Sequence, residues 1–481
     1  MDTKKLRQKI LDLAIHGKLV PQDPNDEPAS VLLERIRAEK ERLIKEGKIK
    51  RPKKSASSDM SHYGNDMPFE LPEGWVWCTV GDIYAHNTGK ALNKADDLGQ
   101  LLEYITTSNL YWDSFVLSDL RKMYFSDDEL EKCTVQKGDL LVCEGGDIGR
   151  AAIWPYNYDI RIQNHIHRLR GILPINNRFY LYVLQLYKWT GLIGGKGIGL
   201  LGFSSRELDK LQVPLPPLHE QNRIVAFAER IFSTIATIEQ SRDVLSHCIT
   251  DTKAKIFDLA ISGKLVPQDP TDEPAIDLLR RINPAFKPCD NPHYPYVIPE
   301  SWQFVALGDI TTFLSRGKSP KYSEEKLYPV FAQKCNQWEG ITLEKVQFLE
   351  PDTLRKWPEE YKLQDGDVLV NSTGTGTLGR TGIFYTRYLG NYPFILPDSH
   401  VTVIRGNKVL ISQEYLYLVS RSAYMQKWMV DNMVGSTNQK ELYPKALEGF
   451  LLALPPRAEQ DRIVSFAKMI LENVEALAIG L

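Results

Sequence analysis

Two short motifs in this sequence of 481 residues carry residue types that bind phosphate in other proteins. Residues 374–379 (GTGTLG) have the glycine spacing of a dinucleotide-binding loop, and residues 317–319 (GKS) match the end of a phosphate-binding loop. A dinucleotide loop needs a helix directly after it, because the helix N-terminus binds the pyrophosphate. The next residues, 380–385 (RTGIFY), favour a strand instead, and the second motif has Thr312 where the loop requires glycine. We therefore interpret both motifs as turns.

Other catalytic patterns are also missing from the sequence. His165 and His167 lie two residues apart, which is more typical of a strand or loop pair than of metal ligands. Residues 291–294 (NPHY) are not the Asn-Pro-Pro-aromatic tetrad of amino-methyltransferases, and no paired-carboxylate nuclease centre is recognisable. No CxxC pair occurs, so reduced thiols are expected rather than disulfides or zinc. The cysteines are Cys78, Cys133, Cys143, Cys248, Cys289 and Cys335. We predict a chain without catalysis, cofactor or metal of its own.

Composition and charge set broad limits on the class of protein. A net charge of −2 counts against a chain held on nucleic acid by its overall field, although a local positive surface remains compatible with it. No run of 18 apolar residues occurs, so we expect no membrane span. The first residues lack the apolar core of a signal peptide, and a cytoplasmic protein is expected. The length predicts two or more domains.

An internal duplication organises the whole chain. Residues 9–29 and 255–275 are identical at 18 of 21 positions, at a constant offset of 246 residues. Three weaker repeats follow in the same order in both halves. They pair residues 71–83 with 298–310, 136–142 with 364–370, and 216–231 with 455–470. The sequence is therefore two copies of one unit, and a repeat of this size decides the architecture.

A long helix is predicted between the two copies, over residues 218–262. Apolar or small residues recur there at alternating spacings of four and three, which gives roughly five heptads of a coiled coil. These positions are Ile224, Ala228, Ile231, Ile235, Ile238, Leu245, Ile249, Ile256 and Leu259. Gly263 and Pro267 end the pattern. At 1.5 Å per residue, the helix would be roughly 65 Å long.

The second copy of this helix is divided between the two ends of the chain. Ile463, Ala467, Ile470, Val474 and Leu477 match its first half, and Leu6, Ile10 and Leu13 match its second half. We infer that the helices pair antiparallel and bury their apolar faces, so that the chain ends meet in a circular, pseudo-twofold arrangement. The alternative is that each helix packs only on its own domain.

The predicted fold class is α+β, with two mixed α/β domains separated by long antiparallel coiled-coil helices. The domains comprise residues 71–217 and 298–456. The helices comprise residues 1–17, 218–262 and 457–481, and the linkers are 18–70 and 263–297. Within the first linker, residues 35–58 carry ten Lys or Arg and three Glu, and they have no counterpart in the second half. We interpret this segment as a solvated, partly helical linker, with a phosphate or partner contact as the alternative.

These motifs together resemble the specificity subunits of type I restriction–modification systems. The resemblance rests on the GKLVPQDP segments, the PxxWxxxxxGDI openings, the GDxLV strands with their Gly-Arg turns, and the PLPPLHEQNRIV exit, and it covers nearly the whole chain. The exit of the second domain, LLALPPRAEQDRIV, is less regular. The resemblance implies two target-recognition domains that each read half of a split sequence in double-stranded DNA. It also implies two modification subunits with S-adenosylmethionine and restriction subunits with ATP and Mg as partners.

Sequence readout requires side chains that reach base edges, together with phosphate contacts that fix the register. We expect them on loops at the open ends of the two domains. The first-domain candidates for DNA binding are Lys90, Arg150, Lys196, Ser204, Ser205 and Arg206. The second-domain candidates are Lys318, Asn371, Ser372, Thr373, Arg380, Thr437, Asn438, Gln439 and Lys440. The alternative function is a helix-based protein-interaction scaffold that does not read DNA.

Overall fold

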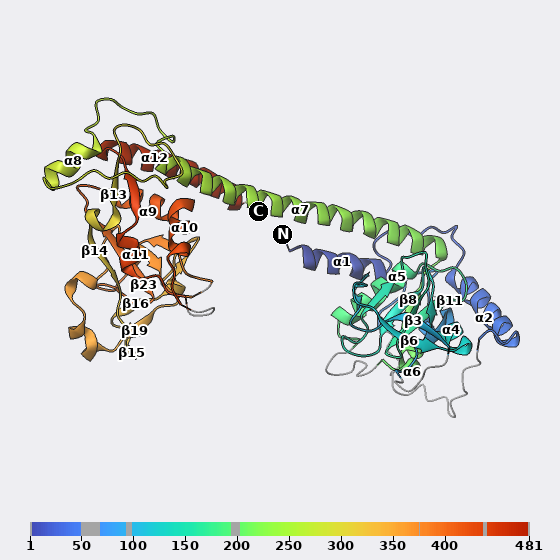
Figure 1. Cartoon of the computed structure of the whole chain (residues 1–481). Helices are drawn as coiled ribbons and strands as arrows, with labels where there is room; N and C mark the ends of the chain where they lie inside the picture. Colours follow the sequence, from blue (N-terminus) through green and yellow to red (C-terminus); the bar gives the residue numbers. More distant parts are fainter. Residues whose placement is uncertain are drawn as a thin grey trace. The chain divides into compact units, whose positions relative to one another are not determined.

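The computed structural model in Figure 1 describes residues 2–49, 68–92, 99–193, 203–374, 376–435 and 440–479. The chain divides into two compact units, Met1–Gln240 and Ser241–Leu481. Each unit holds one α/β domain and one pair of helices, and the boundary falls inside the long helix α7 (Leu218–Ile261). The predicted α+β class with two mixed domains and a long helix between them is confirmed. No helix in the described ranges is long and apolar enough to cross a membrane.

The domain of the first unit contains two four-stranded sheets. One has the order β2-β11-β8-β9 and is antiparallel: Tyr84–Thr88, Ile166–Gly171, Leu140–Cys143 and Ala151–Ile153. The other has the order β6-β3-β10-β7: Arg121–Phe125, Gln100–Ile105, Ile160–Ile162 and Thr134–Val135. A two-stranded ladder of β1 (Val76–Thr79) and β12 (Gln212–Leu215) joins the beginning of the domain to its end. The remaining elements are α3 (Val80–Ile83), β4 (Leu110–Tyr111), β5 (Ser114–Phe115), α4 (Asp127–Cys133), α5 (Asn177–Trp189) and α6 (Ser205–Lys210).

The second domain repeats this plan. Its first sheet has the order β14-β23-β20-β21: Thr311–Arg316, Val401–Gly406, Val368–Asn371 and Thr381–Ile383. Its second sheet has the order β15-β19-β16-β22: Tyr322–Ser323, Gln347–Leu349, Pro329–Phe331 and Leu396–Pro397. The ladder of β13 (Gln303–Ala306) and β24 (Leu451–Leu454) corresponds to the ladder of β1 and β12. The helices are α9 (Gln413–Arg421), α10 (Ala423–Asp431) and α11 (Pro444–Glu448), and β17 (Asn336–Gln337) pairs with β18 (Gly340–Ile341).

Apolar sequence runs explain the central strands of both domains. Every residue of β8 (LLVC) and of β20 (VLVN) is buried, as expected for strands covered on both faces. The aspartate that precedes each strand fixes its position: Asp139 pairs with Arg170 at 2.6 Å, and Asp367 pairs with Arg405 at 2.7 Å. Each carboxylate also accepts a backbone N–H from the residue three positions earlier, at 2.8 Å. The repeated GDxLV motif therefore anchors one strand of each sheet.

Each unit pairs two helices in antiparallel orientation. In the first unit, α1 (Thr3–Ile15) packs on the first half of α7, with Arg7 bonded to Glu239 at 3.0 Å. In the second unit, the other half of α7 packs on α12 (Arg457–Ile479), with Lys253 bonded to Glu475 at 3.0 Å. The buried members of the predicted apolar faces are Ile10, Ile224, Ala228, Ile235, Ile256, Ile463, Ala467 and Val474. Partly buried are Leu13, Ile231, Ile249, Leu259 and Ile470.

Four of the positions predicted for the coiled coil and subunit interface are exposed in the structure. Leu6, Ile238, Leu245 and Leu477 are 36 to 63% exposed. They lie near the ends of the two terminal helices or in the middle of α7, where the pairing within each unit runs out, because residues 243–246 have no counterpart in the repeat. The circular arrangement, the pseudo-twofold axis and the meeting of the chain ends concern the placement of the two units, and they stay predictions.

Candidate DNA interface

A buried tryptophan–glutamate bond fixes each domain against its helix. Trp75 Nε1 donates to Glu220 Oε2 at 2.9 Å, and Trp302 Nε1 donates to Glu459 Oε2 at the same distance. Burial raises the pKa of both carboxyl groups, although the tryptophan bonds oppose this effect. These bonds join the PxxW motif at the start of each domain to the EQxRI motif at the start of each helix. We call this connection the Trp–Glu joint, and it occurs once in each half of the chain because both motifs are repeated.

Two ion pairs complete the joint. Arg223 binds Asp26 through two hydrogen bonds of 3.1 and 2.6 Å, and Arg462 binds Asp272 through two of 3.2 and 2.6 Å. Both aspartates belong to the PQDPxDEP segments that follow the GKLV residues. The segment after each helix is therefore tied to the first turns of the partner helix, which sets the orientation of the domain.

The Gly-Arg turns follow the anchored strands. Gly149 and Gly379 have φ values of 80° and 81°, a conformation that favours glycine, and each turn leads into the next strand of its sheet. Arg150 Nη2 donates to the carbonyl of Thr107 at 2.6 Å. Arg380 Nη1 donates to Gln337 Oε1 at 2.6 Å. Both arginines are half-buried, so they fix the turn as well as presenting positive charge at the end of the sheet.

A second turn on each domain carries an exposed histidine that our sequence analysis missed. His165 precedes β11, and His400 precedes β23, at equivalent places in the two sheets. His165 lies 3.7 Å from Glu144, and His400 Nδ1 lies 2.9 Å from Thr373 Oγ1. Each histidine thus faces the Gly-Arg turn. An alignment of QNHIHR with DSHVTV would have found this shared position.

In the second domain, several polar side chains gather beside this histidine. Thr373 Oγ1 contacts Gln333 Oε1 at 3.5 Å, and Thr377 Oγ1 donates to the same oxygen at 2.9 Å. The carbonyl of Lys440 accepts a bond of 3.2 Å from the backbone N–H of Gly374, which places Lys440 beside the turn. The second-domain candidates Thr373, Arg380 and Lys440 therefore lie in one region, together with His400.

Three candidates are unsuited to contact DNA in this structure. Lys90 is buried, and its Nζ donates at 2.8 Å to Glu129 Oε2 and to the carbonyl of Tyr124. Asn371 and Ser372 are fully buried. Asn371 donates to the carbonyl of Gln333 at 3.1 Å, and the Ser372 hydroxyl bonds to that of Thr402. The prediction failed because Asn371 ends strand β20 and does not begin the loop.

The other described candidates lie at or near the surface. Ser204, Ser205 and Arg206 are exposed at the beginning of α6, where Ser204 forms a reciprocal capping box with Glu207. Lys318 occupies the position equivalent to Lys90 but is half-exposed, with Nζ 2.8 Å from the carbonyl of Lys356. The remaining candidates lie outside the described residues: Lys196, Thr437, Asn438 and Gln439.

The first part of the basic segment is helical. Its residues to Lys45 belong to helix α2 (Ala29–Lys45), and Arg35 binds Glu27 at 2.5 Å. Helix α8 (Ala275–Ile282) is a shorter counterpart, in which Arg281 binds Glu273 at 2.8 Å. Of the basic segment, only Arg35 and Ile36 therefore have equivalents, Arg281 and Ile282, whereas residues 37–45 of α2 extend beyond the end of α8. Within the described part, Glu27 pairs with Arg35, Glu39 and Glu46 pair with Arg42, and Glu46 pairs with Lys48.

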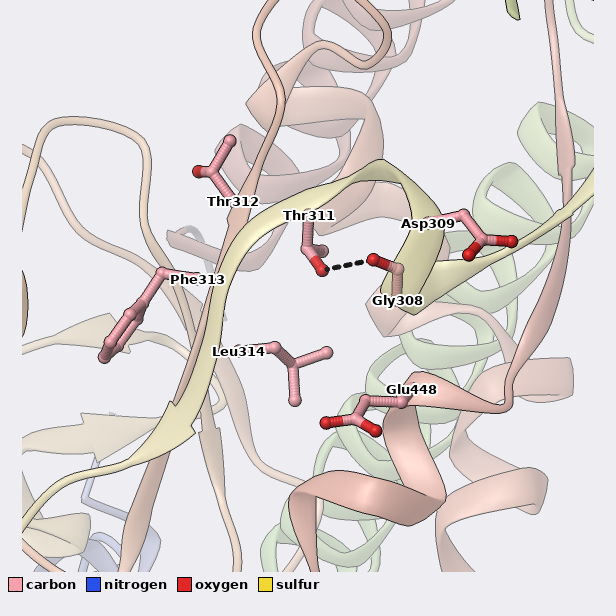
Figure 2. A pocket seen from close by; sticks show the side chains of 7 residues that line it. All are labelled: Gly308, Asp309, Thr311, Thr312, Phe313, Leu314 and Glu448. Atoms are coloured by element: carbon pink, nitrogen blue, oxygen red, sulfur yellow. Dashed lines mark hydrogen bonds between the residues drawn. The ribbon is translucent and has the colours of Figure 1, made fainter. Parts of the chain in front are cut away.

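Neither metal nor phosphate chemistry is favoured by the remaining features. Within the described ranges, no group of three His, Cys, Asp or Glu is arranged to hold a metal ion. A pocket of about 420 Å³ lies between β14 and α11 in the second domain (Figure 2). It is lined by Gly308, Asp309, Thr311, Thr312, Phe313, Leu314 and Glu448. Its two carboxylates would repel an anion. The described part of the glycine motif, residues 376–379, forms a turn that leads into strand β21 and not into a helix, in agreement with the interpretation as a turn.

Comparisons with known proteins agree with this architecture. The family model for the type I restriction modification DNA specificity domain matches twice, over residues 72–247 and 299–478. The EcoAI specificity subunit of Escherichia coli is 28% identical, over 98% of this chain and 90% of that protein. The EcoEI specificity subunit of the same organism is 28% identical, over 96% of this chain and 88% of that protein.

A solved structure shares the fold. It is described as "Structural basis underlying complex assembly and conformational transition of the type I R-M system", and it matches with a TM-score of 0.57 and 18% identity. The match covers 85% of this chain and 93% of that one. Members of the family supply specificity, while methyl transfer and cleavage lie on other subunits. The chain therefore belongs to the type I restriction–modification specificity subunits, and it carries the DNA specificity domain of that family twice.

Proposed function

We propose that each domain reads one half of a bipartite target in double-stranded DNA, and that the helices set the distance between the half-sites. One observation carries this proposal: the joints and strand anchors are the same in both copies, whereas the polar side chains around the turns differ. A repeated scaffold with different surfaces suits the recognition of two different sequences. Two readers in opposite orientation would contact half-sites about one helical turn apart.

The DNA contacts are assigned to the turns at the end of the first sheet in each domain. The described residues proposed for these contacts are Arg150, His165, Ser204, Ser205 and Arg206 in the first domain, and Lys318, Thr373, Arg380, His400 and Lys440 in the second. Lys196, Thr437, Asn438 and Gln439 stay in the proposal on sequence grounds. Asparagine and glutamine can bond adenine with two hydrogen bonds, which makes residues 437–440 the strongest base-reading candidates.

The helices are proposed to bind the partner subunits. In the second unit, α12 exposes Phe466, Met469 and Leu477, and α7 exposes Val244 and Leu245, each between 39 and 63%. A group of exposed apolar side chains on an otherwise charged helix is typical of a protein–protein interaction surface. We assign this surface to one of two modification subunits, which would bring S-adenosylmethionine. Restriction subunits would bring ATP and Mg, and the complex would work in the cytoplasm.

Exchange of one domain tests the reading of DNA. The methylated adenines of the host genome are mapped first, which gives the bipartite target. Residues 71–217 are then replaced by the corresponding domain of a relative. We expect one half-site to change and the other to stay the same. Changes in both halves would contradict the assignment of one half-site to each domain.

A double variant separates DNA reading from a pure scaffold. Asn438→Ala with Lys440→Ala should weaken DNA binding by the assembled complex without loss of assembly. Unchanged binding together with unchanged methylation sites would favour the protein-interaction scaffold.

A single charge tests the partner surface: Leu477→Asp should reduce co-purification of the modification subunits. Lys468→Asp is the matched control, because Lys468 is exposed on the side of α12 opposite to Leu477. Equal effects of the two aspartates would argue against an interface at Leu477.

A further inference from the structure

A chain of hydrogen bonds crosses the interior of the first domain between α6 and the sheet. Asp209 Oδ1 lies 2.7 Å from His86 Nδ1, and His86 Nε2 lies 2.9 Å from His167 Nδ1. His167 Nε2 lies 2.6 Å from the carbonyl oxygen of Phe203. The His86 and His167 side chains are buried on neighbouring strands, β2 and β11. The chain thus ties both ends of segment 203–210, which contains α6, to the sheet.

This chain of hydrogen bonds requires one more proton than two neutral imidazole rings carry. The carbonyl of Phe203 and an ionised Asp209 only accept hydrogen bonds, so His167 Nε2 and His86 Nδ1 must both donate. The bond between the rings needs a third N–H, on either His86 Nε2 or His167 Nδ1. Two neutral imidazoles supply only two N–H groups. When all three hydrogen bonds are formed, one of the two rings is therefore an imidazolium.

Of the two rings, only that of His86 contacts a carboxylate. Burial lowers the pKa of His167 to about 4, so its ring is neutral. Asp209 is the carboxylate that contacts His86, and its side chain is 46% exposed. The other elements packed on β2 are α3 and α4. Asp82 on α3 is bonded to Thr79, and Glu129 on α4 is bonded to Lys90.

The second domain has different residues at the same places. Leu314 pairs with Ile404 in the sheet as His86 pairs with Leu169, and Thr402 takes the position of His167. Glu448 lies beside Gly308 as Asp209 lies beside Gly81. Figure 2 shows Leu314 and Glu448 on the wall of an open pocket rather than joined by a bond. The histidine chain therefore distinguishes the first domain from the second.

We propose that His86 and His167 are positioning residues for the first half-site, and that they hold segment 203–210 through a proton shared within the chain. The inference rests on the proposed function, because Ser204, Ser205 and Arg206 in this segment are assigned to DNA. Loss of the proton as the pH rises removes one of the three hydrogen bonds. The segment then loosens, and binding to the first half-site weakens while the second half-site is read as before.

The test uses the complete chain assembled with its modification subunits. The dissociation constant for a duplex with the mapped target is measured between about pH 5.5 and 8, the range in which imidazole titrates. We expect a loss of about fivefold toward high pH, which is the effect of one net hydrogen bond. His86→Leu introduces the residue found at this place in the second domain. It should bind weakly over the whole range and lose this part of the pH slope. Glu448→Gln is the matched control and should behave as the wild type.

Amide exchange of segment 203–210 in the wild type gives an independent measurement, without a variant that could misfold. After correction for the intrinsic rate, protection of the segment should fall as the pH rises. Protection that does not change with pH, or a His86→Leu complex with the full wild-type pH slope, would overturn the proposal. The slope that remains in His86→Leu reports other groups, such as the exposed His165. These outcomes are separate from the domain exchange, whose failure would instead remove the assignment of the first half-site.

Discussion

Replacement of Gly17 by alanine should lower the free energy of unfolding of the first unit. Gly17 follows helix α1 with a φ of +64°, and a Cβ built there would lie 2.4 Å from Pro72 Cγ. Gly263 is its counterpart after α7, with a φ of +69° and a Cβ 2.4 Å from Pro299 Cγ. Both prolines belong to the PxxW motifs. The glycine of GKLVPQDP thus lets each helix end approach the start of its domain.

The size of the effect follows from two contributions. A left-handed backbone costs an alanine about 1–2 kcal/mol. A contact at 2.4 Å is far shorter than the roughly 3.5–4.0 Å of ordinary carbon atoms, and relief of such overpacking costs about 1–3 kcal/mol. Gly17→Ala should therefore reduce the free energy of unfolding of the first unit by about 2–5 kcal/mol. Gly47 has a φ of +72° with no atom within 4 Å of its Cβ, so Gly47→Ala should cost only about 1–2 kcal/mol.

Hydrogen exchange can measure these losses one unit at a time. The slowest amides of the sheet that contains β8 report the opening of the first unit, and those of the sheet that contains β20 report the second. Gly17→Ala should lower protection in the first unit alone, and Gly263→Ala in the second alone. Equal losses for Gly17→Ala and Gly47→Ala would refute the reasoning, because the contact with Pro72 would then contribute nothing.

Three further predictions concern burial. Arg405→Leu leaves the nearly inaccessible carboxylate of Asp367 unpaired, and it should cost the second unit about 3–5 kcal/mol in the same exchange measurement; a loss near zero would contradict the anchoring role. Glu220 has a raised pKa in the folded state, so its contribution to stability is complete below its unfolded pKa and is lost as the pH rises through the folded value. Glu220→Gln should therefore gain stability relative to the wild type between acid and neutral pH in chemical denaturation, and a constant difference would contradict this. Cys248 is the one exposed thiol of the six, so a maleimide should label it first in the native chain, as mass spectrometry can show.

The sequence repeats predict the scaffold well for a physical reason. Trp75 and Trp302, with the glutamates they bind, recur at corresponding places, and a bond that serves both copies appears twice in the sequence. Burial is harder to predict. Lys90 and Lys318 follow the same type of strand. Lys90 is buried and binds the carboxylate of Glu129, whereas Lys318 is half-exposed and binds a backbone carbonyl, that of Lys356. That difference depends on a helix that lies far away in the sequence.

The boundary between strand and loop causes the other errors. Asn371 and Ser372 are polar and precede glycines, which favours an exposed turn. In the structure their side chains instead bond to Gln333 and Thr402 beneath the turn. A polar residue whose hydrogen bonds are satisfied inside a domain has the same sequence pattern as one that faces solvent. The sequence alone therefore cannot rank the polar residues of a recognition turn.

The buried residues beneath each turn indicate that a change of DNA specificity requires exchange of a whole domain. The residue at the end of the anchored strand is Cys143 in the first domain and Asn371 in the second. Asn371 accepts a bond of 3.2 Å from Asn336, and Arg380 needs Gln337, both from another part of the second domain. If residues 371–380 replaced 143–150, Asn371 and Arg380 would lose these partners, and a buried polar group without a partner costs about 1–3 kcal/mol. A grafted turn would therefore not keep its shape, whereas a complete domain brings its own partners and keeps the Trp–Glu joint that binds it to the helix.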